Sequence, residues 1–132
     1  MTLHALVPML RTWDFPRSLA FYVDVLGFAC VAGGADDGWA ALQRDGIELM
    51  LSAPNAHLAE TAAAFTGSLY CRVDDVDGWW ARLHDRARVC YPIGDFEHGM
   101  REFAVFDDSG YLLQFGRPLD AIDASAPAST GA

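Results

Sequence analysis

Two stretches of the chain place apolar residues at the spacing of an amphipathic helix. The first carries them at i, i+4, i+7 and i+11, as Phe15, Leu19, Tyr22 and Leu26. Asp14 precedes this stripe as a candidate N-cap, Pro16 fits the first turn of a helix, and Gly27 follows where helices commonly end. The pattern therefore predicts a helix between Asp14 and Gly27.

The second stretch repeats the arrangement further along the chain. Val76, Trp80 and Leu83 form its apolar stripe, and Asp75 is the candidate N-cap. When Asp75 is superimposed on Asp14, the two stripes coincide. This agreement indicates that the two helices occupy equivalent places in a repeated unit.

Short apolar runs bounded by turn residues surround the two helices. They predict strands at Leu3–Thr12, Phe28–Ala32, Gly38–Arg44, Ile47–Ser52, Ser68–Val73, Val89–Tyr91, Arg101–Phe106 and Tyr111–Gly116. The order is strand, helix and three strands, and then the same order again. We therefore predict an α+β fold of two βαβββ modules that form curved mixed sheets around a cup, with the helices packed on the outer face.

A change of composition marks the division between the modules. Residues 53–66 are rich in Ala and contain Pro54, so we expect module one to span 1–54 and module two 66–117. Neither module alone buries enough surface for a stable core, so we treat 1–117 as one domain. The small and polar residues of the tail, 118–132, predict a flexible segment.

The first hairpin predicts which side chains face a ligand. Asp45-Gly46 suits the positive φ angles of a two-residue type I′ turn. One face of that hairpin is then uniformly apolar and should meet the helix, with Ala40, Leu42, Leu49 and Leu51. The other face is mixed, with Trp39, Gln43, Glu48 and Met50. Because such a surface suits a ligand better than a core, Trp39, Glu48 and Met50 are candidate ligand-binding residues.

The charge balance narrows the classes of partner. Nine cationic residues stand against eighteen Asp and Glu, for a net charge of −9, and the pI is near 4.6. This balance argues against a nucleic-acid partner, because contacts to phosphates need clustered cations. All nine cations are Arg, which excludes a Schiff-base or P-loop lysine mechanism. A small-molecule ligand is compatible with the composition, and the negative net charge favours a cationic one.

The N-terminal residues carry no targeting signal that we can identify. Their apolar stretch has no basic segment before it and is too short to span a bilayer, so we expect no membrane partner and a cytoplasmic protein. Three cysteines without CxxC spacing argue against a disulfide framework or a zinc cluster.

Four segments together resemble the vicinal oxygen chelate superfamily, which includes glyoxalase I, extradiol dioxygenases and the fosfomycin and bleomycin resistance proteins. These segments are SLAFYVDVLGF, DGIELML, VDDVDGWWARL and GMREFAVFDDSGYLLQFGRPL. The resemblance covers about residues 4–119 and is specific for the fold. It is less specific for function, because one fold hosts many chemistries.

The resemblance also implies where a metal would be bound. Metal-binding members place His and Glu ligands at positions that fall here on Val7, Glu48, Ser68 and Gln114. Only Glu48 is a strong ligand, and Val7 cannot coordinate a cation. A divalent cation needs three or four converging donors, so we expect no metal and no cofactor at this site.

The second module supplies further candidates for the same cup. Tyr70 and Arg72 share the strand face of Ser68 and should line it. Phe103 should stand opposite Gln114 if DDSG is a four-residue loop, and a bulge there would shift this pairing by one residue. His98 lies in the loop before the predicted strand Arg101–Phe106, near the cup, where it would bind a ligand or transfer a proton. No catalytic triad is recognisable from the spacing.

Two hypotheses follow. The first is a binding protein similar to the non-metal bleomycin resistance proteins, which act as homodimers and sequester a flat, cationic drug in aromatic-lined grooves. Here Glu48 is either the counter-charge for a cationic group or a remnant of the ligand set. The second is a superfamily enzyme of lyase, isomerase or dioxygenase type. It would use an unrecognised metal set, or metal-free acid–base chemistry through Glu48 and His98.

Overall fold

The computed structural model describes residues 1–55 and 62–119, and it divides the chain into two compact units, Met1–Ala64 and Phe65–Ala132. Each unit contains a four-stranded mixed sheet built from the order strand, helix and three strands. The predicted α+β fold is thereby confirmed. The predicted tail lies outside the described residues from position 120 onward.

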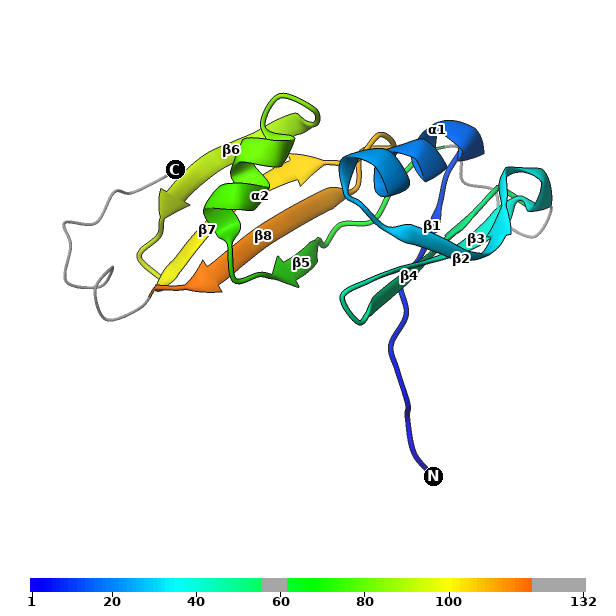
Figure 1. Ribbon diagram of the computed structural model, residues 1–132, viewed down its shortest axis with the longest axis horizontal. Coiled ribbons are helices and arrows are strands. Elements are labelled where there is room, and N and C mark those ends of the chain that lie inside the picture. Colours follow the sequence, from blue (N-terminus) through cyan, green and yellow to red (C-terminus); the bar gives the residue numbers. More distant parts are fainter. Residues whose placement is uncertain (56–61, 120–132) are drawn as a thin grey trace. The chain divides into compact units, whose positions relative to one another are not determined.

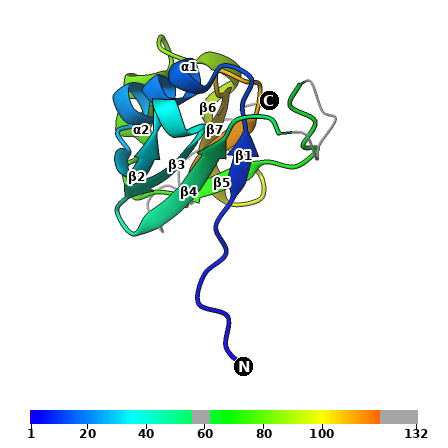
Figure 2. The same cartoon turned by 90° about the vertical axis from the view of Figure 1, so that its right-hand side faces the viewer.

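The first unit builds its sheet in the order β1-β4-β3-β2, with β1 parallel to β4 and the other pairs antiparallel (Figures 1 and 2). Its elements are β1 (Met9–Arg11), α1 (Phe15–Ala20), the π-helical turn η1 (Phe21–Val25), β2 (Ala29–Gly34), the 3-10 turn η2 (Ala35–Asp37), β3 (Trp39–Arg44) and β4 (Ile47–Ser52).

The second unit repeats this topology in the order β5-β8-β7-β6, with β5 parallel to β8. Figure 1 shows α2 lying across one face of this sheet. Its elements are β5 (Leu69–Arg72), α2 (Val76–Leu83), β6 (Arg88–Asp95), β7 (Met100–Phe106) and β8 (Leu112–Pro118).

Both predicted N-caps are confirmed. The Asp14 carboxylate accepts a hydrogen bond from the backbone N–H of Arg17, and the Asp75 carboxylate accepts one from Gly78. The first helix widens in its second half, where the N–H of Leu26 donates to the carbonyl of Phe21, five residues earlier. It ends before Gly27, whose φ of 80° suits a glycine.

The register of the first hairpin is also as predicted. Asp45 and Gly46 have φ angles of 51° and 79°, so they form the tight turn between β3 and β4. The apolar face, with Ala40, Leu42, Leu49 and Leu51, is buried, and Gln43 lies opposite Glu48.

Two predicted strands have different lengths in the structure. The prediction Leu3–Thr12 is wrong in extent, because only Met9–Arg11 pairs with β4 and the residues before it extend away from the sheet (Figure 2). Pro8 has no N–H to offer a neighbouring strand. The prediction Val89–Tyr91 is too short, because β6 runs to Asp95. Pro92 is tolerated there since β6 is an edge strand and its register shifts around this residue.

The loop between β7 and β8 corrects the predicted position of Phe103. The loop is one residue longer than expected, because Phe106 pairs with Leu112, and Phe103 therefore lies opposite Phe115 rather than Gln114. Phe103 is fully buried, stacks on Phe115 at a ring-centre distance of 5.1 Å and meets Trp80 of α2 edge-on at 5.2 Å. It belongs to the core under the helix and not to the ligand-facing surface.

No helix among the described residues is long and apolar enough to cross a membrane.

Candidate functional site

The second sheet has one face without a helix, and polar side chains gather on it. Phe103 and Phe115 point toward α2, so their strand neighbours point the other way. The register places Tyr70 beside Gln114 and Arg72 beside Gly116 across β5 and β8, and Glu102 beside Gly116 across β7 and β8. Three strands therefore contribute to one surface.

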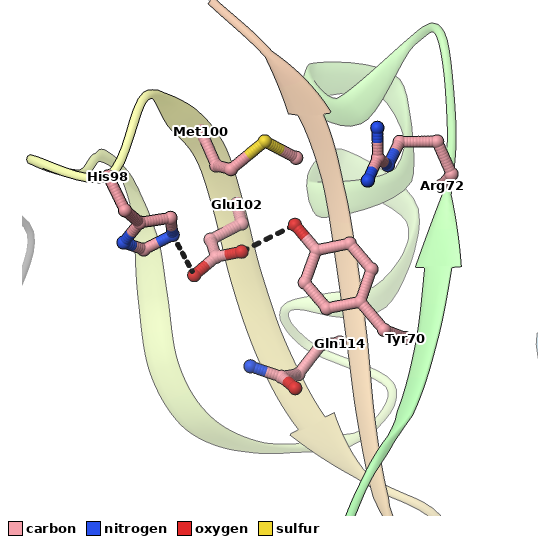
Figure 3. A pocket seen from close by; sticks show the side chains of 6 residues that line it. All are labelled: Tyr70, Arg72, His98, Met100, Glu102 and Gln114. Carbon is pink, nitrogen blue, oxygen red and sulfur yellow. Dashed lines mark hydrogen bonds and ion pairs between the residues drawn. The ribbon is translucent and has the colours of Figure 1, made fainter.

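This surface holds an open cavity of about 420 Å³. Figure 3 shows the side chains that line it: Tyr70, Arg72, His98, Met100, Glu102 and Gln114. The volume is within the range of ordinary small-molecule sites.

The carboxylate of Glu102 lies at the centre of a hydrogen-bond network. The Tyr70 hydroxyl donates to Glu102 Oε2 at 2.5 Å, and the Tyr91 hydroxyl donates to Oε1 at 3.2 Å. His98 Nε2 lies 3.1 Å from the same Oε1 (Figure 3). The side chain of Glu102 is only 6% exposed, so a charged group is held inside the protein by three neighbours.

The network continues away from the carboxylate. Gln114 Nε2 donates to the Tyr91 hydroxyl at 2.8 Å, and Gln114 Oε1 accepts from the Ser68 hydroxyl at 2.5 Å. These bonds fix the orientation of the Gln114 amide and of the Tyr91 phenol. The polar side of the cavity is thus organised before any ligand arrives.

The two tyrosines remain protonated in the neutral range. Burial raises the pKa of the Tyr70 phenol, and its hydrogen bond to Glu102 raises this pKa further. Burial also raises the pKa of Tyr91, with a contribution from the nearby Glu102 charge, while the hydrogen bond from Gln114 lowers it. Both phenols therefore act as donors to the carboxylate.

Gly116 makes the Tyr70 contact possible. A Cβ at this position would lie 2.1 Å from the Tyr70 hydroxyl oxygen and 3.0 Å from the Cβ of Glu102. The phenol crosses β8 through the space that a side chain would occupy. A glycine here is therefore a requirement of the site and not of the backbone conformation.

Arg72 brings a positive charge to the other side of the cavity. Its guanidinium lies 5.9 Å from the ring centre of Tyr70, within the range of a cation–π contact. It makes no ion pair or hydrogen bond with any residue that the structure describes. The cavity thus has a buried carboxylate and a solvent-facing guanidinium.

The candidates from the first module lie on the first unit's sheet and are not among the residues that line this cavity. Trp39, Glu48 and Met50 are half-buried on the sheet face opposite the apolar one. The indole of Trp39 packs over Gly33, where a Cβ would lie 2.8 Å from its ring carbon Cε3.

The structure brings together four of the predicted ligand-binding residues, namely Tyr70, Arg72, His98 and Gln114. Whether they bind a ligand is still a prediction. The sequence reasoning missed Glu102, Met100 and Tyr91.

The expected four-residue loop after β7 is one residue shorter than the observed one, so the predicted register turns Glu102 away from the cavity. The Asp107 carboxylate accepts hydrogen bonds from the backbone N–H groups of Ser109 and Tyr111, which stabilises the longer loop. An Asp two residues before Ser-Gly is typical of such a turn, and that signal would have moved the register by one.

The positions where metal-binding relatives carry ligands do not fit a divalent cation here. Ser68 and Gln114 are neutral and hydrogen-bond each other, and Val7 has no donor atom. Among residues 1–55 and 62–119, no group of three His, Cys, Asp or Glu side chains is arranged to hold a metal ion.

The comparisons with known proteins point to a single family. The sequence model of the Glyoxalase/Bleomycin resistance protein/Dioxygenase superfamily matches residues 3–115. Among curated proteins, no relative matches this sequence.

Similar solved structures come from several bacteria. The bleomycin-binding protein of Streptomyces verticillus, solved with copper(II)-bleomycin, is 27% identical, with a TM-score of 0.65 over 87% of this chain and 96% of its own. TioX from a Micromonospora species is 25% identical, with a TM-score of 0.70 over 88% and 99%. A lactoylglutathione lyase from Agrobacterium tumefaciens is 21% identical, with a TM-score of 0.68 over 89% and 96%, which shows the shared fold alone.

Proposed function

Since this chain belongs to the glyoxalase/bleomycin resistance protein/dioxygenase superfamily, we propose that it is a binding protein that sequesters a planar or cationic small molecule, such as a bleomycin-type antibiotic. The proposal includes homodimeric assembly and action in the cytoplasm, as the resemblance and the composition lead us to expect. It assigns binding, and not a chemical transformation, to the cavity of the second unit.

The observation that carries the proposal is the buried Glu102 carboxylate inside an open cavity. A negative charge held by neutral phenols attracts a positive group of a ligand. The ring of Tyr70, which is 40% exposed, offers a face on which a planar group can stack. The net charge of −9 favours the approach of cations to the whole protein.

The comparisons add support for the ligand class. Two of the similar structures, each 27% identical to this chain, are described as bleomycin-binding proteins with bleomycin bound. At this level of identity the residues that line equivalent cavities can differ. The comparison therefore supports a class of ligand and not individual contacts.

The direct test is isothermal titration calorimetry, in which the purified protein is titrated with metal-free bleomycin and, separately, with copper(II)-bleomycin. We expect saturable binding with one drug site per chain, and recovery of the drug chemically unchanged. The absence of binding by both forms at millimolar concentration would remove drug sequestration as the function.

A second candidate is an enzyme that uses His98 for proton transfer. The pairing of His98 Nε2 with the Glu102 carboxylate at 3.1 Å favours it, because such a carboxylate orients an imidazole. Mass spectrometry of the recovered ligand separates the two candidates. A modified product that disappears in His98→Ala would favour the enzyme.

A further inference from the structure

Glu102 has a charge that no permanent cation balances within the described residues. Its hydrogen-bond partners are the phenols of Tyr70 and Tyr91, which are neutral, and the imidazole of His98. Of these three, only His98 can carry a positive charge. A buried carboxylate usually requires a cationic partner, so the position that His98 occupies beside Glu102 suits a cation.

The contact with His98 is also the one that a ligand can displace. Tyr70 and Tyr91 belong to strands β5 and β6, whereas His98 lies in the turn between β6 and β7, next to Gly99 with a φ of 84°. The His98 side chain is 56% exposed, although it contacts a carboxylate that is 6% exposed. Its imidazole therefore stands between solvent and Glu102.

We propose that Glu102 anchors a ligand cation that carries N–H donors, such as an amidinium, a guanidinium or a primary ammonium, and that this group takes the place of His98. The inference rests on the proposed binding function and names the chemistry of the ligand at that site. A carboxylate favours N–H donors because each forms a charge-assisted hydrogen bond, which a quaternary ammonium cannot form.

The charges of the other side chains around Glu102 are consistent with a ligand cation at the place of His98. Tyr70 from β5 and Tyr91 from β6 donate hydrogen bonds to Glu102, Gln114 from β8 donates to Tyr91, and all three side chains are uncharged near neutral pH. Arg72 is the one permanent cation among the lining residues, and it would repel a ligand cation. Figure 3 shows His98 and Arg72 on opposite sides of the hydrogen bond between Glu102 and Tyr70. The His98 side is therefore the favourable entrance for a cation.

Three small aromatic probes test the chemistry of the site. Benzamidine carries N–H donors and a positive charge, benzyltrimethylammonium carries the charge alone, and benzoate carries the opposite charge. Titrations followed by NMR should show benzamidine bound at least about fivefold more tightly than either of the other probes. Equal affinity for the two cations would contradict the requirement for N–H donors.

Two substitutions in the site should act in opposite directions. Glu102→Gln should weaken benzamidine binding at least about tenfold, because the charge-assisted hydrogen bonds are lost. His98→Ala should strengthen it, because the competing imidazole is removed. Glu97→Gln removes the same charge from the exposed neighbouring turn residue and should leave the affinity within about twofold. Since His98 is an exposed turn residue, the His98→Ala result stands even if Glu102→Gln fails to fold.

The outcomes separate this inference from the proposed function. Benzamidine binding that depends on Glu102 and is strengthened by His98→Ala supports the inference, even if bleomycin does not bind. Bleomycin binding without any benzamidine binding at about 10 mM would overturn the inference and leave the proposed function in place. Benzamidine binding that is weakened by His98→Ala would also overturn it, because His98 would then assist the ligand.

Discussion

Gly116 shows how a single residue controls the geometry of the cavity. The Tyr70 phenol occupies the space above β8 that a side chain at position 116 would fill, and from there it reaches the Glu102 carboxylate. The phenol is the far end of a side chain that is 40% exposed, so it can move outward. A substitution at this glycine would therefore act on the site through the Tyr70 hydroxyl, and its Cβ would also lie 3.0 Å from the Cβ of Glu102 on β7.

We expect Gly116→Ala to push the Tyr70 hydroxyl away from Glu102. Because burial and the hydrogen bond to Glu102 both raise the pKa of Tyr70, the substitution should lower that pKa toward the ordinary phenol value of about 10. Tyrosinate absorbance during an alkaline titration measures the change, and Tyr70→Phe identifies which transition belongs to Tyr70. A titration curve identical to that of the wild type would show that the phenol does not depend on Gly116.

At the scale of elements, helix α2 and the cavity lie on opposite faces of the same strands. Trp79 stacks on Phe115 at 5.3 Å and Trp80 meets Phe103 at 5.2 Å, so the helix covers β7 and β8 with aromatic rings. Glu102 and Gln114 precede Phe103 and Phe115 in the sequence. Because successive side chains of a strand point to opposite faces, these two line the cavity. The helix therefore stabilises the strands on which the site is built without touching the site itself.

We expect Asp75→Ala to destabilise the protein by about 1 kcal/mol, because the Asp75 carboxylate caps α2 through the N–H of Gly78. Urea unfolding followed by circular dichroism measures the free energy of unfolding. Asp85→Ala is the matched control, since it removes the same charge from an exposed residue after the helix and should change stability by less than about 0.5 kcal/mol. Equal effects of the two substitutions would contradict the role of the cap.

At the scale of the whole molecule, each sheet has two edge strands. They are β1 and β2 in the first sheet, where Val31 of β2 is 53% exposed, and β5 and β6 in the second. Proteins protect or pair such edges, and the commonest protein oligomers are two-fold dimers, in which the same surface of two identical chains meets.

We therefore expect a homodimer, as the family resemblance also implies. Size-exclusion chromatography with light scattering should give a mass of about twice the 14.4 kDa of the chain at micromolar concentration and moderate salt. A mass equal to that of one chain under these conditions would contradict the prediction.

Local chemistry in the sequence determined much of the fold. The Asp45-Gly46 turn set the register of β3 and β4, because its positive φ angles suit few other residues. Asp14 and Asp75 marked the starts of the two helices through hydrogen bonds to N–H groups three residues away. The repeated order of elements then indicated two similar units. Each of these features depends on residues that are close together in the chain.

The tertiary structure decided the features that depend on distant partners. β1 is short because only Met9–Arg11 pairs with β4. The β7–β8 loop is longer than expected because backbone N–H groups donate hydrogen bonds to the Asp107 side chain. That loop places Phe103 in the core and Glu102 in the cavity. The network around Glu102 joins β5, β6, β7 and the turn at His98, and periodicity along one strand contains no information about such contacts between strands.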